Sequence, residues 1–183
     1  MKMSETEVEG SIAIEIDRIA DDRGFFARIW DEGEFAGVGM RVPWRQANVG
    51  FSDRSGTLRG MHFQADPAAE WKLVRCTRGS VFDVAVDLRP GSPSETPWTG
   101  LELSAENGRM LLIPPGCAHG YVTLEPRSEI MYLTSASYAP ELAGGVRWND
   151  PQFGITWPVE PTVISPQDAA WPDWQQPGPG GNQ

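Results

Sequence analysis

The sequence predicts an all-β fold, a sandwich or barrel with short peripheral helices, on three observations. Short segments alternate apolar and polar residues with a period of two, which is the pattern of half-buried strands. Turn residues separate these segments, and the chain of 183 residues holds 20 glycines and 16 prolines. Helical periodicity is almost absent. We expect one domain over residues 1–174, followed by a disordered, low-complexity tail at 175–183.

The expected elements follow the chain in order. Residues 1–8 are polar and expected to be frayed, and the stretch 31–39 is the one place where a short helix fits. Strand patterns occupy residues 12–16, 23–30, 44–52, 57–64, 71–77, 80–89, 100–103, 109–113, 119–124 and 128–135. After residue 138 the chain becomes irregular, with one helical turn expected at Asp168.

Two of these strands place side chains that matter for chemistry. Alternate apolar residues from Phe82 to Leu88 share one face, and Asp83 lies on the other face. The pattern leaves open whether Asp83 points to solvent or into the interior. Tyr132 shares a face with Ile130, so we expect its ring to point inward and its hydroxyl to need a partner.

Composition restricts the class of partner. The formal net charge of −10 argues against nucleic acid or an anionic membrane as partner. Residues 23–78 nevertheless hold nine Lys or Arg against six Asp or Glu, which suits a small anion such as a sugar nucleotide. No run approaches the roughly 18 apolar residues of a membrane span, and the acidic start does not resemble a signal peptide. We therefore expect a cytoplasmic protein.

The chain has only two histidines, His62 and His119, and both are in or beside predicted strands. Histidine accepts a proton near neutral pH, whereas a tyrosine such as Tyr132 is normally protonated and can donate. Arg59 and Lys72 lie near His62 in the sequence and suit an oxyanion or a phosphate. Inverting a carbon next to a ketone needs a base on one face and an acid on the other. Each residue also has a plain structural interpretation, and spacing alone leaves the choice open.

The corner PPGCAHGY resembles the second cupin motif, and this resemblance implies a cupin-like jelly roll. Most cupins bind a metal through two closely spaced histidines and a glutamate in the first motif plus a histidine in the second. Here the first motif offers no second histidine, so a metal site would need His62, His119 and Glu70. A metal-dependent oxygenase is the weaker alternative, and we expect no metal and no cofactor.

Six segments follow one another in the order DDRGFFARIW, RQANVGFSDRSGTLRGMHFQ, KLVRCTRGSVFDVAVDLRPGSP, IPPGCAHGYVTL, YLTSASYAP and VRWNDPQFGITWP. In this order they resemble the dTDP-4-dehydrorhamnose 3,5-epimerase family, over roughly residues 12–171. The resemblance implies a metal-free jelly-roll homodimer that acts on a nucleotide-linked 4-keto-6-deoxyhexose, one step before the reductase that completes the deoxysugar. It also implies that the N-terminal segment holding Arg23 and Phe26 is exchanged across the dimer.

The resemblance implies roles for individual residues. His62 is the general base that removes the C3 or C5 proton, paired with Asp168, and Asp83 is the second choice for that carboxylate. Tyr132 is the acid that reprotonates the opposite face, and Lys72 stabilises the enolate. The implied substrate-binding residues are Arg23 and Arg59 for the diphosphate, Gln46 and Asn48 for the ligand, Phe26 and Tyr138 for the base, and His119 with Asp83 around the sugar.

Two departures from the family pattern bear on the substrate. Arg28 stands where relatives often carry a glutamate in RGFFxE, and Glu70-Trp71 stands where many have Gln-Gly before Lys72. The nucleotide (dTDP, CDP or GDP), the 4-keto sugar and the number of inverted centres therefore stay open. The remaining alternatives are a 3-epimerase and a non-catalytic cupin that binds a sugar nucleotide.

Overall fold

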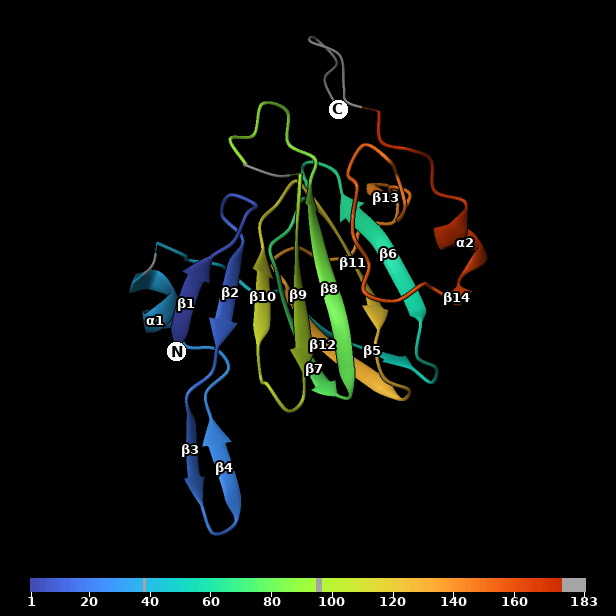
Figure 1. Ribbon diagram of the computed structural model, residues 1–183. Coiled ribbons are helices and arrows are strands. Elements are labelled where there is room, and N and C mark those ends of the chain that lie inside the picture. The colour runs from blue at the N-terminus through green and yellow to red at the C-terminus, as the bar shows by residue number, and fades with distance from the viewer. Residues whose placement is uncertain (38, 95–96, 176–183) are drawn as a thin grey trace.

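A computed structural model describes residues 1–37, 39–94 and 97–175, and in it two mainly antiparallel sheets pack face to face (Figure 1). The first sheet runs in the order β1 (Lys2–Glu5), β2 (Ile12–Glu15), β10 (Met110–Ile113), β7 (Lys72–Arg78), β12 (Ser128–Thr134) and β5 (Gln46–Ser52). The second runs β13 (Ala143–Gly145), β6 (Thr57–Gln64), β11 (Cys117–Thr123), β8 (Ser80–Asp87) and β9 (Trp98–Ser104), with β14 (Val163–Ile164) parallel to β6. A separate hairpin pairs β3 (Arg18–Asp21) with β4 (Gly24–Ala27). The expected all-β jelly roll is confirmed.

The core between the sheets is built from alternate residues of facing strands. The first sheet contributes residues such as Val74 and Ile130, and the second contributes Ala85 and Leu103, all buried in one cluster. Removing such side chains from water stabilises the fold by roughly 25 cal/mol per Å² of apolar surface. Tyr132 packs against the edge of this cluster, so the apolar core ends where the candidate catalytic residues begin.

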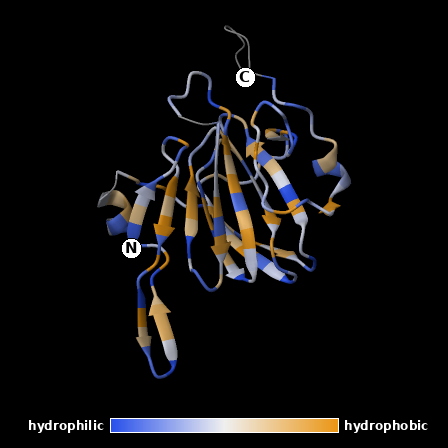
Figure 2. Ribbon diagram, in the orientation of Figure 1, coloured by the Kyte–Doolittle hydropathy of each residue, from blue (hydrophilic) through white to orange (hydrophobic). Residues whose placement is uncertain are grey.

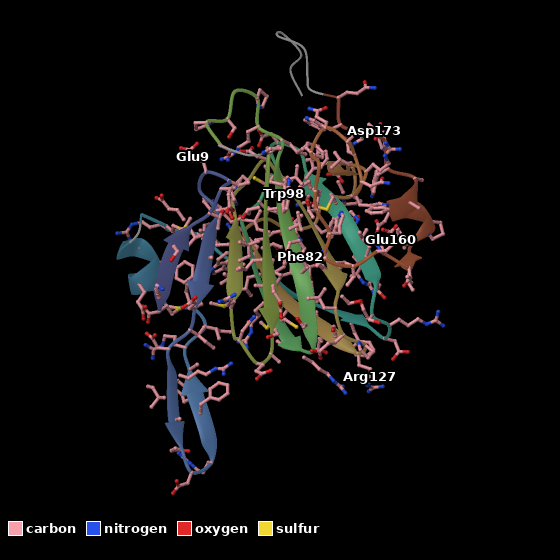
Figure 3. The ribbon with its side chains drawn as sticks, viewed as in Figure 1. Glu9, Phe82, Trp98, Arg127, Glu160 and Asp173 are labelled. Carbon is pink, nitrogen blue, oxygen red and sulfur yellow. The ribbon has the colours of Figure 1, made fainter. Side chains whose placement is uncertain are left out.

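Both faces of β8 are buried, which decides the direction of Asp83. On the outer face, Val84 belongs to a second apolar cluster, and the Phe82 ring packs edge-on against Trp157 at 6.3 Å. Phe82 and Trp98, labelled in Figure 3, lie on the neighbouring strands β8 and β9 of this sheet. The apolar face seen in the sequence is therefore the outer one, covered by the C-terminal part of the chain. Asp83 points into the sandwich and is fully buried.

The prediction that residues 1–8 are frayed is wrong. β1 pairs antiparallel with β2, with Met3 opposite Ile14, and Val8 is fully buried. The terminal amino group lies 2.8 Å from the carboxylate of Asp17. An edge strand needs only one apolar face and pairs through its backbone, so its polar sequence gave little strand signal.

Both short helices lie where they are expected. α1 (Glu32–Gly37) packs Phe35 against the outer side of the first sheet. α2 (Pro166–Ala169) starts after the N-cap Ser165, whose Oγ accepts a hydrogen bond from the backbone N of Asp168 at 3.0 Å. No helix in the described part of the chain is long and apolar enough to cross a membrane. Most of the expected tail, residues 176–183, lies outside the described residues.

Candidate active site

A cavity opens between the two sheets, where polar side chains replace the apolar core. It has two adjoining parts, with volumes of about 470 Å³ and 530 Å³. His62, Lys72, Tyr132 and Gln167 line both parts. Small-molecule sites commonly enclose about 300–1,000 Å³, so the cavity has the size of a ligand site.

His62, on β6, is backed by a buried carboxylate. Its Nε2 lies 2.6 Å from Oδ1 of Asp168, and Oδ2 of Asp168 accepts a hydrogen bond from the backbone N of Gly60 at 3.3 Å. Burial works to raise the pKa of Asp168, but the hydrogen bond and charge of His62 hold that pKa below its ordinary value. The carboxylate is therefore ionised at neutral pH. An imidazole with a carboxylate behind it and a cavity in front is arranged as a general base.

Tyr132 and Lys72 reach the cavity from the other sheet, on β12 and β7. Burial, reinforced by the charge of Glu70, raises the pKa of Tyr132, which keeps the phenol protonated at neutral pH. Burial lowers the pKa of Lys72, and Glu70 opposes that change. An imidazole from one sheet and a phenol from the other thus line one cavity, as the predicted acid–base reaction requires.

His119 has a carboxylate partner of its own. Its Nε2 lies 2.8 Å from Oδ1 of Asp83, and both side chains are buried. β11 lies between β6 and β8 in the sheet, so His119 separates Asp83 from His62. Asp83 as second choice for the partner of His62 is therefore wrong. His119 lines the second part of the cavity, whereas Asp83 lines neither part and does not reach the ligand site.

Four further predicted binding residues line the cavity beside His119. Gln46, Asn48 and Tyr138 line the first part, and Arg59 lines the second. The side-chain oxygen of Gln46 accepts a hydrogen bond from the backbone N of Tyr138 at 2.9 Å, which joins the two. The Arg59 guanidinium donates to the backbone oxygen of Phe51 at 2.9 Å, so the cation is held in place at the cavity wall.

Arg23 and Phe26 do not reach the cavity of their own chain. They lie on the β3–β4 hairpin, which projects away from the sandwich (Figure 1). Arg23 hydrogen-bonds through its Nε to Asp21 at 3.1 Å, and the Phe26 side chain is 63% exposed. Their predicted roles depend on the predicted exchange between subunits.

Sequence reasoning missed several cavity residues. Gln167 lines both parts of the cavity, and Trp171 lines the first part with its ring edge-on to His62 at 6.3 Å. Both flank Asp168 in the segment SPQDAAW, so their place beside an expected site residue was the available signal. Glu70 also lines the first part, in agreement with the expectation that the Glu70-Trp71 departure bears on the substrate, although no catalytic or binding role was predicted for it.

The ligand set that a metal-dependent alternative needs is not assembled. Across residues 1–37, 39–94 and 97–175, no group of three or more His, Cys, Asp or Glu side chains could hold a metal ion. His62 and His119 instead pair with one carboxylate each.

Comparison with known proteins gives the same family that the sequence motifs resemble, over nearly the whole chain. The sequence model of the dTDP-4-dehydrorhamnose 3,5-epimerase family matches residues 5–176. A dTDP-4-dehydrorhamnose 3,5-epimerase of Sinorhizobium fredii is 45% identical over 156 residues, which cover 85% of this chain and 80% of the relative.

Solved structures of such enzymes share the fold. The Bacillus anthracis dTDP-4-dehydrorhamnose 3,5-epimerase, with TDP and PPi bound, has a TM-score of 0.90 at 39% identity, over 94% of this chain and 99% of that one. The Legionella pneumophila dTDP-6-deoxy-D-glucose-3,5-epimerase, in complex with dTDP-4-keto-L-rhamnose, has a TM-score of 0.88 at 36% identity, over 94% and 92% of the two chains. The chain therefore belongs to the dTDP-4-dehydrorhamnose 3,5-epimerase family.

Proposed function

We propose that the protein inverts C3 and C5 of a nucleotide-linked 4-keto-6-deoxyhexose, converting dTDP-4-dehydro-6-deoxyglucose to dTDP-4-dehydrorhamnose. The observation that carries this proposal is the His62–Asp168 pair, at 2.6 Å, in the same cavity as Tyr132. The ligands named for the two solved relatives, TDP and dTDP-4-keto-L-rhamnose, support the substrate class.

The reaction follows from the acidity of a C–H bond next to a ketone. His62 takes the proton from C3 or C5, and the bonding electrons move to the C4 oxygen as an enolate. Lys72 stabilises that negative charge, which is the kind of electrostatic effect that lowers such barriers most. Tyr132 then delivers a proton to the opposite face of the same carbon. The same two proton transfers follow at the other centre.

Each protonation state suits its role at neutral pH. The lowered pKa of Asp168 keeps a carboxylate beside His62, and this charge stabilises the imidazolium that forms during the reaction. The raised pKa of Tyr132 keeps the phenol ready to donate. After each inversion the two groups return to these states by proton exchange with water.

Substrate binding is assigned to cations and amides around the cavity. Arg59 binds the diphosphate, Gln46 and Asn48 contact the ligand, and His119 lines the sugar position. Arg28 lies outside the cavity lining, where it pairs with Asp31 at 3.4 Å. A CDP or GDP sugar is the alternative substrate.

The working unit is proposed to be a homodimer in which each β3–β4 hairpin reaches the neighbouring subunit. The hairpin exposes Ile19, Phe25 and Phe26 by 69%, 55% and 63%, and a protein rarely leaves such a group of large apolar side chains in water. Figure 2 shows the hydrophobic colouring of β4 beyond the body of the sandwich. In this arrangement Arg23 and Phe26 complete the partner's nucleotide site.

The test is incubation with dTDP-4-dehydro-6-deoxyglucose in D₂O, read by NMR. Wild type should place deuterium at C3 and C5, and His62→Asn should slow this exchange by at least about 10²-fold, because the general base is lost. Tyr132→Phe should keep exchange but lose inversion, because the base still acts without the opposing acid.

Other outcomes separate the alternatives. Exchange at C3 alone would indicate a 3-epimerase. Faster exchange with a CDP or GDP sugar would indicate that this sugar, and not the dTDP sugar, is the preferred substrate. Tight binding of all three nucleotide sugars without exchange would indicate a non-catalytic binding protein and end the proposal. A single cooperative urea unfolding transition for each variant serves as the folding control.

A further inference from the structure

The cavity contains a second carboxylate, Glu70, that the reaction described above does not use. Glu70 lines the first part of the cavity, and its side chain is only 9% exposed. Its Oε1 lies 3.5 Å from Nζ of Lys72, and its Oε2 accepts a hydrogen bond from Nε2 of Gln64 at 3.2 Å. A buried carboxylate is costly unless it is paired, so this contact pattern calls for an explanation.

Gln64 fixes where the carboxylate lies. The backbone oxygens of Ala68 and Ser137 also lie 3.1 Å and 3.3 Å from its amide nitrogen, whose two hydrogens are shared among the three acceptors. Its amide oxygen accepts from the backbone N of Ala139 at 2.7 Å. The side chain that holds Glu70 is thus tied to the backbone at three points, and Glu70 is kept beside Lys72.

Lys72 is buried among groups of both signs. Its Nζ is 3.5 Å from the backbone oxygen of His62, so the amine lies beside the strand that carries the proposed base. Burial lowers the pKa of Lys72, and the charge and hydrogen bond of Glu70 are the main effects that raise it. The other titratable and charged groups that face this region are Arg59, His62, Asp83, His119, Tyr132 and Asp168.

We propose that Glu70, held by Gln64 beside Lys72, is a positioning residue of the reaction, which keeps Lys72 protonated inside the cavity. The proposal rests on the proposed role of Lys72, because only a protonated amine stabilises an enolate. The negative charge of Glu70 also opposes the enolate directly. Glu70 therefore raises kcat/KM only at alkaline pH, where Lys72 would otherwise lose its proton.

The first test needs no substrate. The chain has just two lysines, Lys72 and the exposed Lys2, so a ¹³C-lysine label gives two side-chain NMR signals, one of them an internal reference. We expect the Lys72 titration midpoint to fall by about one to two pH units in Glu70→Gln, the usual effect of losing an opposite charge at this range. Glu70→Ala should shift it in the same direction. Lys2 should titrate alike in all proteins.

The matched control is Glu141→Gln, which removes an exposed carboxylate and should leave the Lys72 midpoint unchanged. An unchanged midpoint in both Glu70 variants would overturn the proposal. This result would leave the epimerase function untouched, and a failure of the epimerase test would leave the titration unaffected, so the two failures are distinguishable.

The second test reads the reaction in a background where Tyr132 cannot contribute to the pH profile. Solvent exchange by Tyr132→Phe is compared with exchange by the Glu70→Gln/Tyr132→Phe double variant from pH 6 to 10. The alkaline limb of kcat/KM should move to lower pH by about the NMR shift, with near-equal rates at pH 6.5. Equal alkaline limbs, or a uniform loss at all pH values, would mean that Glu70 is only a packing residue.

Discussion

The two histidines of this protein differ in what lies in front of them. Both have a carboxylate on Nε2, at 2.6 Å for His62 and 2.8 Å for His119. The side chain of His62 is 45% exposed and that of His119 is 9% exposed. A general base must reach the proton that it removes, so the greater accessibility of His62 favours it as the proposed base. His119 forms part of the cavity wall, and Asp83 lies behind it.

Asp168→Asn tests this residue-scale assignment. We expect kcat/KM to fall by about 10²-fold, since the imidazolium loses its stabilising charge. We also expect the free energy of unfolding at pH 7 to fall by about 2 kcal/mol, because a charge-assisted hydrogen bond is replaced by a neutral one. Urea unfolding and steady-state kinetics measure the two effects. Asp173→Asn is the control, because Asp173 (Figure 3) forms an exposed pair with Arg147 that is worth at most about 1 kcal/mol.

The pH dependence of this stability has a defined sign. The folded pKa of Asp168 is lowered, so its contribution is fully present above the ordinary value of 3.8 and is lost as the pH falls through the folded pKa. The stability difference between wild type and Asp168→Asn should therefore shrink below pH 3.8. A difference that stays constant from pH 7 to pH 2.5 would contradict the assignment.

At the scale of elements, the close approach of β6 and β11 sets the position of the base. Gly60 has φ of +141°, and a Cβ built on it would lie 2.5 Å from the Cα of Gly120. His62 follows two residues later on the same strand and pairs in register with His119. A side chain at position 60 would push the two strands apart and move His62 relative to Asp168.

Gly60→Ala should therefore cost about 3 kcal/mol or more of unfolding free energy and most of the activity. Gly91→Ala is the matched control, because Gly91 also has positive φ, +67°, but a Cβ there meets nothing within 4 Å. The control should cost only about 1 kcal/mol, the price of a left-handed conformation in a residue with a side chain. Equal costs for the two variants, measured by urea unfolding, would show that the close approach is unimportant.

At the scale of the whole molecule, the projecting hairpin is the feature on which the proposed exchange between subunits rests. Arg23 and Phe26 lie on β3–β4, away from the cavity of the same chain (Figure 1). Val49 and Phe51, on the edge strand β5, are 66% and 42% exposed. Apolar surface at these two places fits an interface with a second copy, which would bring the hairpin to a partner's site.

Mixing two inactive variants tests the exchange. If each hairpin reaches the partner's site, a mixed dimer of His62→Asn and Arg23→Ala has both substitutions in one site and none in the other. Random reassembly makes half of the dimers mixed, so we expect about a quarter of wild-type activity to return. Each variant alone, refolded in the same way, is the control. No recovery from a mixture that light scattering shows to be dimeric would mean that Arg23 serves its own chain.

Much of the fold could be predicted from local patterns, because alternation and turn residues are local properties. The strands 57–64 and 128–135 were predicted to within one residue of Thr57–Gln64 and Ser128–Thr134. The polar strand Lys2–Glu5 was missed, because an edge strand pairs through backbone groups that every residue carries. Period-two alternation also left the direction of Asp83 open, since both faces of β8 are covered.

The sequence by itself determined the all-β class, most of the long strands, the inward direction of Tyr132 and the family. Only the tertiary structure decided that Asp168 and not Asp83 serves His62, and that Glu70 lies beside Lys72. The physical reason is distance along the chain. His62 and Asp168 are 106 positions apart, and their contact exists only because α2 packs against β6. No local periodicity encodes a contact between such distant segments. The contact forms only when the chain folds and these segments pack together.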